Sequence, residues 1–266
     1  MLTTRNNPCP FCEIQEKSIF GNHDACLKTN LAQNKIENAY QKGQAIYLQD
    51  NPLFGVYCVT EGHVKLVKKA YDGQEVITKL ANPGDFIGLQ GLFSPGQASH
   101  SAIAIEDTVV SFIEKDVIRD SISKSPDLFF NLTKQLNDTV ETEELRVLGL
   151  SRKSVRERVA ETLLTLARSY GIRKVHHDDL STFISLKLTR EELSSLSGTA
   201  VETLIRCLSD YKEEELVRVE GRDIQILNIK GLEDIAGMPH LEHAEYITNS
   251  TDHEKMGPFE QNQFMG

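Results

Sequence analysis

The spacing of apolar positions separates the 266-residue chain into a strand-rich region and a helical region that follows it. From Lys42 to about residue 115, short runs of alternating or β-branched residues are interrupted by Gly, Asp and Pro turn signals. Many short strands between such turns predict an antiparallel barrel or roll. From Pro126 to Leu150, apolar residues recur at steps of three and four, which predicts one long helix with a heptad-like seam.

The stretch from Leu188 to Val217 carries the most specific local pattern. Thr189 stands three residues before Glu192, a capping-box spacing that predicts the start of a helix. Gly198 can adopt a positive φ angle and is expected to end this helix, and Thr199 is expected to start a second one. Two short helices joined by a glycine turn predict a helix-turn-helix.

The second of these helices has two different faces. The inner face carries Ala200, Leu204, Cys207, Leu208 and Tyr211, whereas the outer face carries Val201, Glu202, Ile205, Arg206 and Ser209. Beyond it, residues 217–219 and 224–227 alternate on either side of a turn at residues 220–223. That pattern predicts a β-hairpin, which after a helix-turn-helix is expected to form a wing.

Weaker patterns predict the remaining elements. We expect short helix and loop within residues 22–41, a loop over residues 174–182 and a strand over residues 183–188. We expect Ser151 to cap a helix from Arg152 to Tyr170. Within the long helix, Leu128 and Phe130 are expected to pack against the roll.

Two groups of motifs resemble one known family. The run TREELSSLSGTAVETLIRCLSDYKEEELV, followed by GRDIQILN, resembles the C-terminal domain of the Crp/Fnr family of bacterial transcription regulators. The runs KGQAIYLQDNP, YCVTEGHVKL and NPGDFIGLQGLF resemble the cyclic-nucleotide-binding β-roll of the same family. The resemblance extends from about Lys42 to about Gly231, and it implies an α+β fold in which a roll, a long dimerisation helix and a winged helix-turn-helix follow one another.

The resemblance also implies a division of the chain and a set of partners. The expected parts are a Cys-containing segment (1–41), a β-roll (42–125), a dimerisation helix (126–150), a winged helix-turn-helix (151–231) and an acidic, disordered tail (232–266). The implied partners are a second copy of the chain and double-stranded DNA with a two-fold symmetric site, with RNA polymerase as a further candidate. The expected dimer interface consists of Phe129, Leu132, Leu136, Val140, Glu143 and Val147. Glu143 would face its own copy across the two-fold axis, unless it rotates outward or pairs with Arg146.

The family motif places a Glu and an Arg at the positions of Glu202 and Arg206. A carboxylate can accept a hydrogen bond from cytosine N4, and an Arg can pair with guanine O6 and N7. We therefore expect the pair to read one G·C pair in each half of a site with a TGA-like core. The complete expected DNA-binding set is Thr199, Val201, Glu202, Ile205, Arg206, Arg190 and Arg222.

The ligand of the roll does not follow from the resemblance. Nucleotide-binding members hold the ribose with a Gly-Glu-Leu turn and the cyclic phosphate with an Arg-Ser pair. This chain has Gly88-Leu89-Gln90 and Ala98-Ser99-His100-Ser101 instead. A buried phosphate without a cation loses its charge-assisted hydrogen bonds, and His100 is a weak substitute near neutral pH. The sequence therefore argues against cyclic-AMP binding.

Four cysteines lie in the first quarter of the chain. Cys9 and Cys12 are spaced to bind one metal ion or one edge of a cluster, and Cys26 and Cys58 could complete a four-thiolate site. Oxygen-sensing family members also carry a cysteine-rich segment before the roll, but their fourth cysteine lies on a late strand, near Ser111 here. An iron–sulfur cluster, zinc, a reversible Cys9–Cys12 disulfide, and a buried Cys58 with three incidental cysteines all remain open.

Charge and composition help to predict which kind of protein this chain is. The net charge of −10 is largely due to the segment after Gly231, so the predicted DNA-binding domain is close to neutral. Neither a signal-peptide pattern nor a long apolar run is present, so we expect a cytoplasmic protein that does not enter a membrane. The chain shows no catalytic motif, which favours a signal-responsive transcription regulator over an enzyme. The alternative is a redox- or metal-binding module that uses its helix-turn-helix for protein contacts.

Overall fold

The computed structural model describes residues 34–71, 73–93, 96–176, 179–184 and 186–238. The chain folds into two compact units that divide between Leu148 and Gly149. Cys9, Cys12 and Cys26 lie outside the described residues, as does the predicted acidic tail (232–266) from residue 239 onward. The first residues of that tail are not disordered, because residues up to Ala236 are helical and Leu232 and Ala236 are buried.

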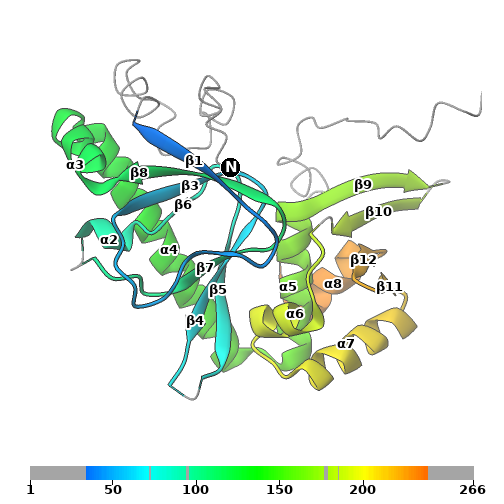
Figure 1. The fold of residues 1–266 in the computed structure, drawn as a ribbon. Helices are drawn as coiled ribbons and strands as arrows, with labels where there is room; N and C mark the ends of the chain where they lie inside the picture. The colour runs from blue at the N-terminus through cyan, green and yellow to red at the C-terminus, as the bar shows by residue number, and fades with distance from the viewer. Residues whose placement is uncertain (1–33, 72, 94–95, 177–178, 185, 239–266) are drawn as a thin grey trace, which may run out of the picture. The chain divides into compact units, whose positions relative to one another are not determined.

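The first unit is built on two four-stranded antiparallel sheets, with strand orders β1-β8-β3-β6 and β2-β7-β4-β5 (Figure 1). The strands are β1 (Lys35–Tyr40), β2 (Ala45–Tyr47), β3 (Gly55–Glu61), β4 (Val64–Lys69), β5 (Glu75–Ala81), β6 (Phe86–Ile87), β7 (Ser101–Ala104) and β8 (Thr108–Glu114). Helices α2 (Gln90–Phe93), α3 (Lys115–Lys124) and the greater part of α4 (Pro126–Arg152) belong to the same unit. The predicted antiparallel roll and long helix are confirmed.

Alternation along β3 and β8 explains one of the two cores of this unit. Val56 pairs with Ile113 and Cys58 pairs with Ser111, and paired residues share one face of a sheet. Val56, Ile113 and Ser111 have no exposed surface, and Cys58 is 2% exposed. Helices cover this face with Leu92, Ile118, Leu128 and Leu132. The start of α4 is therefore fixed to the roll by burial of apolar side chains.

Strand β1 contradicts the expected helix and loop before residue 42. Its residues, from Lys35 to Tyr40, pair with β8 from Ile113 to Thr108. Its side chains are exposed or half-buried, so the local pattern of KIENAY carries little signal for a strand. Pairing is favoured because it satisfies the backbone groups along the free edge of β8.

The second unit contains α5 (Val155–Tyr170), α6 (Arg190–Ser197), α7 (Val201–Glu213) and α8 (Ile229–Ala236). Its four-stranded antiparallel sheet has the order β11-β12-β10-β9. The strands are β9 (Gly171–His176), β10 (Asp179–Ile184), β11 (Val217–Glu220) and β12 (Asp223–Ile226). The predicted loop over residues 174–182 is therefore wrong. Residues 174–176 lie in β9 and residues 179–182 lie in β10, which pairs with β9 on one side and with β12 on the other.

The start of α5 differs from our expectation by three residues. Helix α4 continues through Arg152, and Ser154, not Ser151, caps α5. The Ser154 hydroxyl accepts from the Glu157 amide at 3.3 Å, and the Glu157 carboxylate accepts from the Ser154 amide at 2.6 Å. Only Ser154 is followed three residues later by a glutamate, so only this position allows the reciprocal bonds of a capping box.

Candidate nucleic-acid interface

Helices α6 and α7 and the turn between them form the predicted helix-turn-helix. Thr189 caps α6, since its hydroxyl accepts from the Glu192 amide at 3.2 Å and its amide donates to the Glu192 carboxylate at 2.9 Å. Gly198 ends α6 in the left-handed conformation, with φ 61° and ψ 46°. Glycine adopts this conformation without the steric cost that a Cβ atom would add.

Helix α7 separates a buried face from an exposed face, as its sequence predicts. Leu204, Cys207, Leu208 and Tyr211 are buried. On the opposite side Glu202, Arg206 and Ser209 are exposed and Ile205 is 48% exposed, while Val201 is half-buried. Glu202 and Arg206 lie one helical turn apart, so their side chains share the exposed face. An α-helix fits the major groove of B-DNA, where such side chains can reach base edges.

Thr199 does not start α7 as expected. The N-cap is Ala200, which makes no side-chain capping hydrogen bond. The Thr199 amide instead donates to the Ser194 carbonyl at 3.0 Å, a bond that closes the end of α6. Thr199 is half-buried in the turn, where it belongs to the C-terminal cap of the first helix.

Two predicted DNA-binding arginines lie where the wing meets the start of α6: Arg190 is the first residue of α6, and Arg222 lies in the wing turn. Strands β11 and β12 pair from Val217 with Ile226 to Glu220 with Asp223, and Arg222 is exposed in the turn between them. Arg190 donates to the Gly221 carbonyl in that turn at 2.7 Å. Arg190 therefore fastens the wing to α6, whereas Arg222 is left on the surface beside it.

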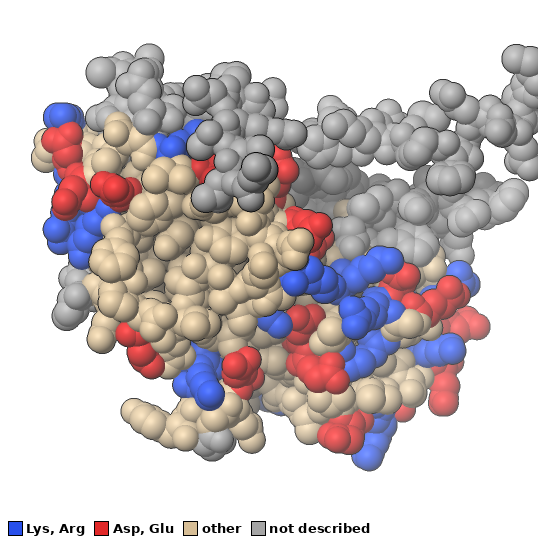
Figure 2. Space-filling view, in the orientation of Figure 1, with Lys and Arg blue, Asp and Glu red and all other residues tan. Residues whose placement is uncertain are grey.

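The charges on this unit are mixed. On the face shown in Figure 2, Lys and Arg side chains are interspersed with Asp and Glu over the second unit and do not merge into one basic surface. A mixed surface gives weak attraction to the phosphate backbone alone. Affinity for a particular site then depends more on contacts with base edges.

Helix α4 presents part of the predicted dimer seam. Phe129, Val140 and Val147 are 44%, 56% and 64% exposed. The prediction that Leu132 belongs to the dimer interface is wrong, because this residue is 1% exposed and lies in the core of its own unit. Leu136 packs against the same core. The prediction that Phe130 packs against the roll is also wrong, since this residue is 68% exposed. One turn of the helix separates Leu128 from Leu132, so both lie on the side that faces the roll.

Glu143 is half-buried on α4, beside the exposed seam. Its expected alternative partner, Arg146, instead donates to the Ile77 and Thr78 carbonyls of β5, at 3.1 Å each. No ion pair between Glu143 and Arg146 is formed in the described structure. The contacts of Arg146 with β5 therefore argue against the alternative in which Glu143 pairs with Arg146.

In the roll, His100 lies in the Ala98–Ser101 stretch that stands in place of the expected Arg-Ser pair. Its Nε2 lies 2.9 Å from the Tyr47 hydroxyl and its Nδ1 lies 3.0 Å from the Ser99 hydroxyl, which donates to Gln90 at 3.0 Å. Burial, with the nearby Lys68 and Lys79, lowers the pKa of His100 from 6.5 to about 4. The ring is therefore neutral at physiological pH and provides no cation for a phosphate.

Of the four cysteines predicted as metal ligands, Cys58 is the one that lies within the described residues. It is 2% exposed within the apolar core, and its thiol donates to the Val59 carbonyl at 3.6 Å. Within the described ranges, no three His, Cys, Asp or Glu side chains gather as they would around a metal ion. A buried thiol surrounded by apolar side chains fits a core residue better than a ligand.

Two family models match the chain. The cyclic nucleotide-binding domain matches residues 37–125, and the Crp-like helix-turn-helix domain matches residues 157–235. These ranges coincide with the roll and with the unit that contains α6, α7 and the wing. In the part of the chain that the structure describes, no helix is both long and apolar enough to cross a membrane.

Individual relatives agree with the two models. The chain is 27% identical over 192 residues to the CRP-like cAMP-activated global transcriptional regulator of Mycobacterium tuberculosis, covering 70% of this chain and 82% of that protein. It is 26% identical over 234 residues to the fumarate and nitrate reduction regulatory protein of Yersinia pestis, covering 87% and 91%. The structure of FixK2 from Bradyrhizobium japonicum superposes with a TM-score of 0.66 at 26% identity, covering 78% of this chain and 99% of that one.

A β-roll followed by a long helix and a winged helix-turn-helix defines a DNA-binding transcription regulator with a separate effector-type domain. This chain belongs to the Crp/Fnr family of such regulators, whose members are not enzymes. The predicted class of protein is confirmed. The alternative, a metal-binding module with a helix-turn-helix for protein contacts, has no support from these relatives.

Proposed function

We propose that this regulator acts as a homodimer whose two copies of α7 each read a G·C pair in one half of a two-fold symmetric DNA site. The observation that carries the proposal is the exposure of Glu202 and Arg206 one turn apart on the outer face of α7. Arg206 supplies two donors for guanine O6 and N7, and Glu202 accepts from cytosine N4. Arg222 in the wing turn is placed for a phosphate, which sets register without reading sequence.

A binding assay tests this function. The probe is a duplex with two TGA half-sites in two-fold arrangement, centred about one helical turn apart, compared with a duplex whose two G·C pairs are changed to A·T. We expect the first duplex to bind more tightly and the logarithm of affinity to fall linearly with the logarithm of salt concentration, because binding releases counterions. Equal affinity for both duplexes together with no salt dependence would contradict DNA reading.

Dimerisation through α4 is the second part of the proposal. Phe129, Val140 and Val147 form an exposed apolar stripe of the kind that pairs two parallel helices. A two-fold axis along this stripe would bring each Glu143 close to its copy, and two like charges there repel each other. The dimer is therefore expected to be only marginally stable. RNA polymerase is the proposed partner of the DNA-bound form.

Glu143→Leu is expected to tighten the dimer by about tenfold. Repulsion of roughly 1 kcal/mol between the two carboxylates is removed, and apolar area is added to the stripe. Sedimentation velocity at low protein concentration measures the dissociation constant. The matched control is Glu141→Leu, since Glu141 is exposed on the same helix away from the stripe. An equal effect of both changes would show that the gain comes from general hydrophobicity.

The signal is proposed to act through thiols or a metal centre rather than through cyclic AMP. A neutral His100 bonded to Tyr47 supports the absence of cyclic-AMP binding. A cluster or zinc site would depend on Cys9, Cys12 and Cys26, with Cys58 as the fourth candidate, and the burial of Cys58 in the core argues against its part in it. Absorbance spectra and metal analysis of protein purified with and without oxygen distinguish an iron–sulfur cluster, zinc and thiol oxidation.

A further inference from the structure

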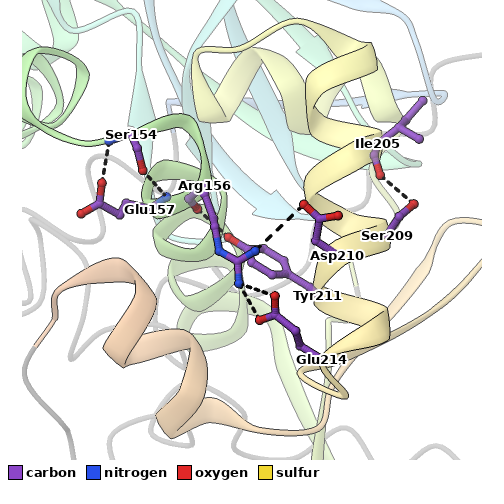
Figure 3. A network of polar contacts seen from close by, with 8 residues as sticks. All are labelled: Ser154, Arg156, Glu157, Ile205, Ser209, Asp210, Tyr211 and Glu214. Atoms are coloured by element: carbon purple, nitrogen blue, oxygen red, sulfur yellow. Dashed lines mark hydrogen bonds and ion pairs between the residues drawn. The ribbon is translucent and has the colours of Figure 1, made fainter.

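The C-terminal end of α7 is held by Arg156, from the first turn of α5 (Figure 3). The Arg156 guanidinium donates to both carboxylate oxygens of Glu214, at 2.7 and 2.5 Å, and lies 4.0 Å from Asp210. It also stacks over the Tyr211 ring, with 5.1 Å between its central carbon and the ring centroid. The Tyr211 hydroxyl donates to the Arg156 carbonyl at 2.5 Å, so the contact includes backbone as well as side chains.

The end of α6 that leads into α7 is held by Arg158, two residues further along α5. Arg158 donates through Nε to the Ser197 carbonyl at 3.1 Å and through Nη2 to the Gly198 carbonyl at 2.9 Å. Ser197 is the last residue of α6 and Gly198 is its C-cap, so both carbonyls precede α7. Two residues on a helix are about 200° apart around its axis, so Arg156 and Arg158 reach in different directions from one turn. A single turn of α5 thus contacts the C-terminal end of α7 and the residues that lead into its N-terminal end.

This turn follows directly after the last turn of α4. Lys153 and Ser154 alone separate the two helices, and Arg158 also donates to the Lys153 carbonyl at 2.8 Å. Leu150, in the last turn of α4, lies so close to Gly198 that a Cβ added there would be 2.5 Å from it. The junction between α4 and α5 is therefore packed against the turn of the helix-turn-helix.

We propose that Arg156 is a positioning residue for base reading: together with Arg158 it sets the angle of α7 relative to α5. The inference rests on the proposed reading of DNA by Glu202 and Arg206. None of the contacts of Arg156 involves these two side chains. A helix of thirteen residues is about 20 Å long, so a tilt of about 3° displaces one end by about 1 Å. Such a displacement is large for a bidentate contact with guanine.

The experiment compares affinity for the two-fold TGA duplex with affinity for the duplex whose G·C pairs are changed. Arg156→Gln and Glu214→Gln are each expected to reduce the ratio of the two affinities about five- to tenfold. This is the effect expected when the stabilisation from one ion pair and one stacked arginine is lost in each of the two subunits. The double variant is expected to lose no more than either single variant, because all three break the same contact. The salt dependence is expected to stay unchanged, since Arg156 is engaged with Glu214 rather than with a phosphate.

Lys212→Gln and Glu213→Gln are the matched controls, because both residues are exposed on α7 and each change removes the same charge as its counterpart. Circular dichroism verifies that each variant retains its helices. An unchanged affinity ratio in both Arg156→Gln and Glu214→Gln would overturn the positioning role. Losses that add in the double variant, or a salt slope reduced by about one phosphate contact in Arg156→Gln, would overturn it as well.

Arg206→Ala separates this inference from the function on which it rests. If Arg206→Ala lowers the affinity ratio and the Arg156 and Glu214 variants do not, base reading stands and the positioning role is wrong. If Arg206→Ala leaves the ratio unchanged, base reading itself is wrong and the positioning role falls with it. A reduced ratio in all three variants, with the controls unaffected, supports both.

Discussion

Arg206→Ala is expected to weaken binding to the two-fold TGA duplex by about 1–3 kcal/mol per half-site and to remove the preference for G·C at that position. Arg206 is exposed one turn after Glu202, on the face of α7 opposite to the buried Leu204, Cys207 and Leu208. Its guanidinium can donate two parallel hydrogen bonds to guanine, a geometry that alanine cannot replace. Because both copies of the chain lose the contact, the total effect on the dimer is about twice that of one half-site.

Fluorescence anisotropy with a labelled duplex measures the loss, and a panel with each base pair changed in turn locates it. Lys212→Ala is the control, since Lys212 is exposed on the same helix but away from Glu202 and Arg206. Base reading predicts that the loss of affinity is concentrated at one base pair of each half-site. A loss that is equal for every sequence would show that Arg206 contacts only phosphate.

The roll is expected to lose about 3 kcal/mol of stability through His100 alone between pH 7.5 and pH 4. Burial lowers the pKa of this ring from 6.5 to about 4. Between these two values the unfolded chain binds a proton that the folded roll does not bind, so protonation favours unfolding as the pH falls. The contribution is fully present above pH 6.5 and disappears as the pH approaches 4. Each unit of pKa corresponds to about 1.4 kcal/mol.

Urea unfolding of the wild type and of His100→Gln at matched pH values isolates this effect from the carboxylates that titrate in the same range. Glutamine can still bond to the Tyr47 hydroxyl but does not titrate. At pH 7.5 the variant is expected to be as stable as the wild type or less stable. Near pH 4 its free energy of unfolding relative to that of the wild type should be up to about 3 kcal/mol higher than at pH 7.5. A difference between the two proteins that stays constant with pH would show that the ring titrates normally.

The helix-turn-helix could be predicted from the sequence because each of its signals is local. The capping box of Thr189 and Glu192, the left-handed turn at Gly198 and the spacing of apolar residues in α7 each need only a few consecutive residues. The same is true of the exposed positions of Glu202 and Arg206, which follow from the period of the helix. Where two local signals competed, as at Ser151 and Ser154, the reciprocal bond to Glu157 decided the helix start.

Only the tertiary structure decided which apolar residues of α4 face the roll. The heptad-like spacing does not distinguish Leu132, which is buried in the core, from Val140, which is 56% exposed. The roll covers the first turns of the helix and leaves other positions uncovered, and periodicity alone does not contain this difference. Strand β1 is a similar case, because its weak pattern becomes a strand by pairing with β8, more than 60 residues later in the chain.

The contacts that hold α7 are also a product of the tertiary structure. Arg156 and Glu214 are 58 residues apart, and Arg158 is 40 residues from Gly198. In the sequence these arginines are merely two basic residues near the start of a helix, with no spacing that marks their partners. Sequence by itself therefore determined the helix-turn-helix and the exposed face of α7 that we propose reads DNA, since both depend on local periodicity. The folded chain decided how that face is held, because the residues that hold it meet only after α5 and α7 have packed together.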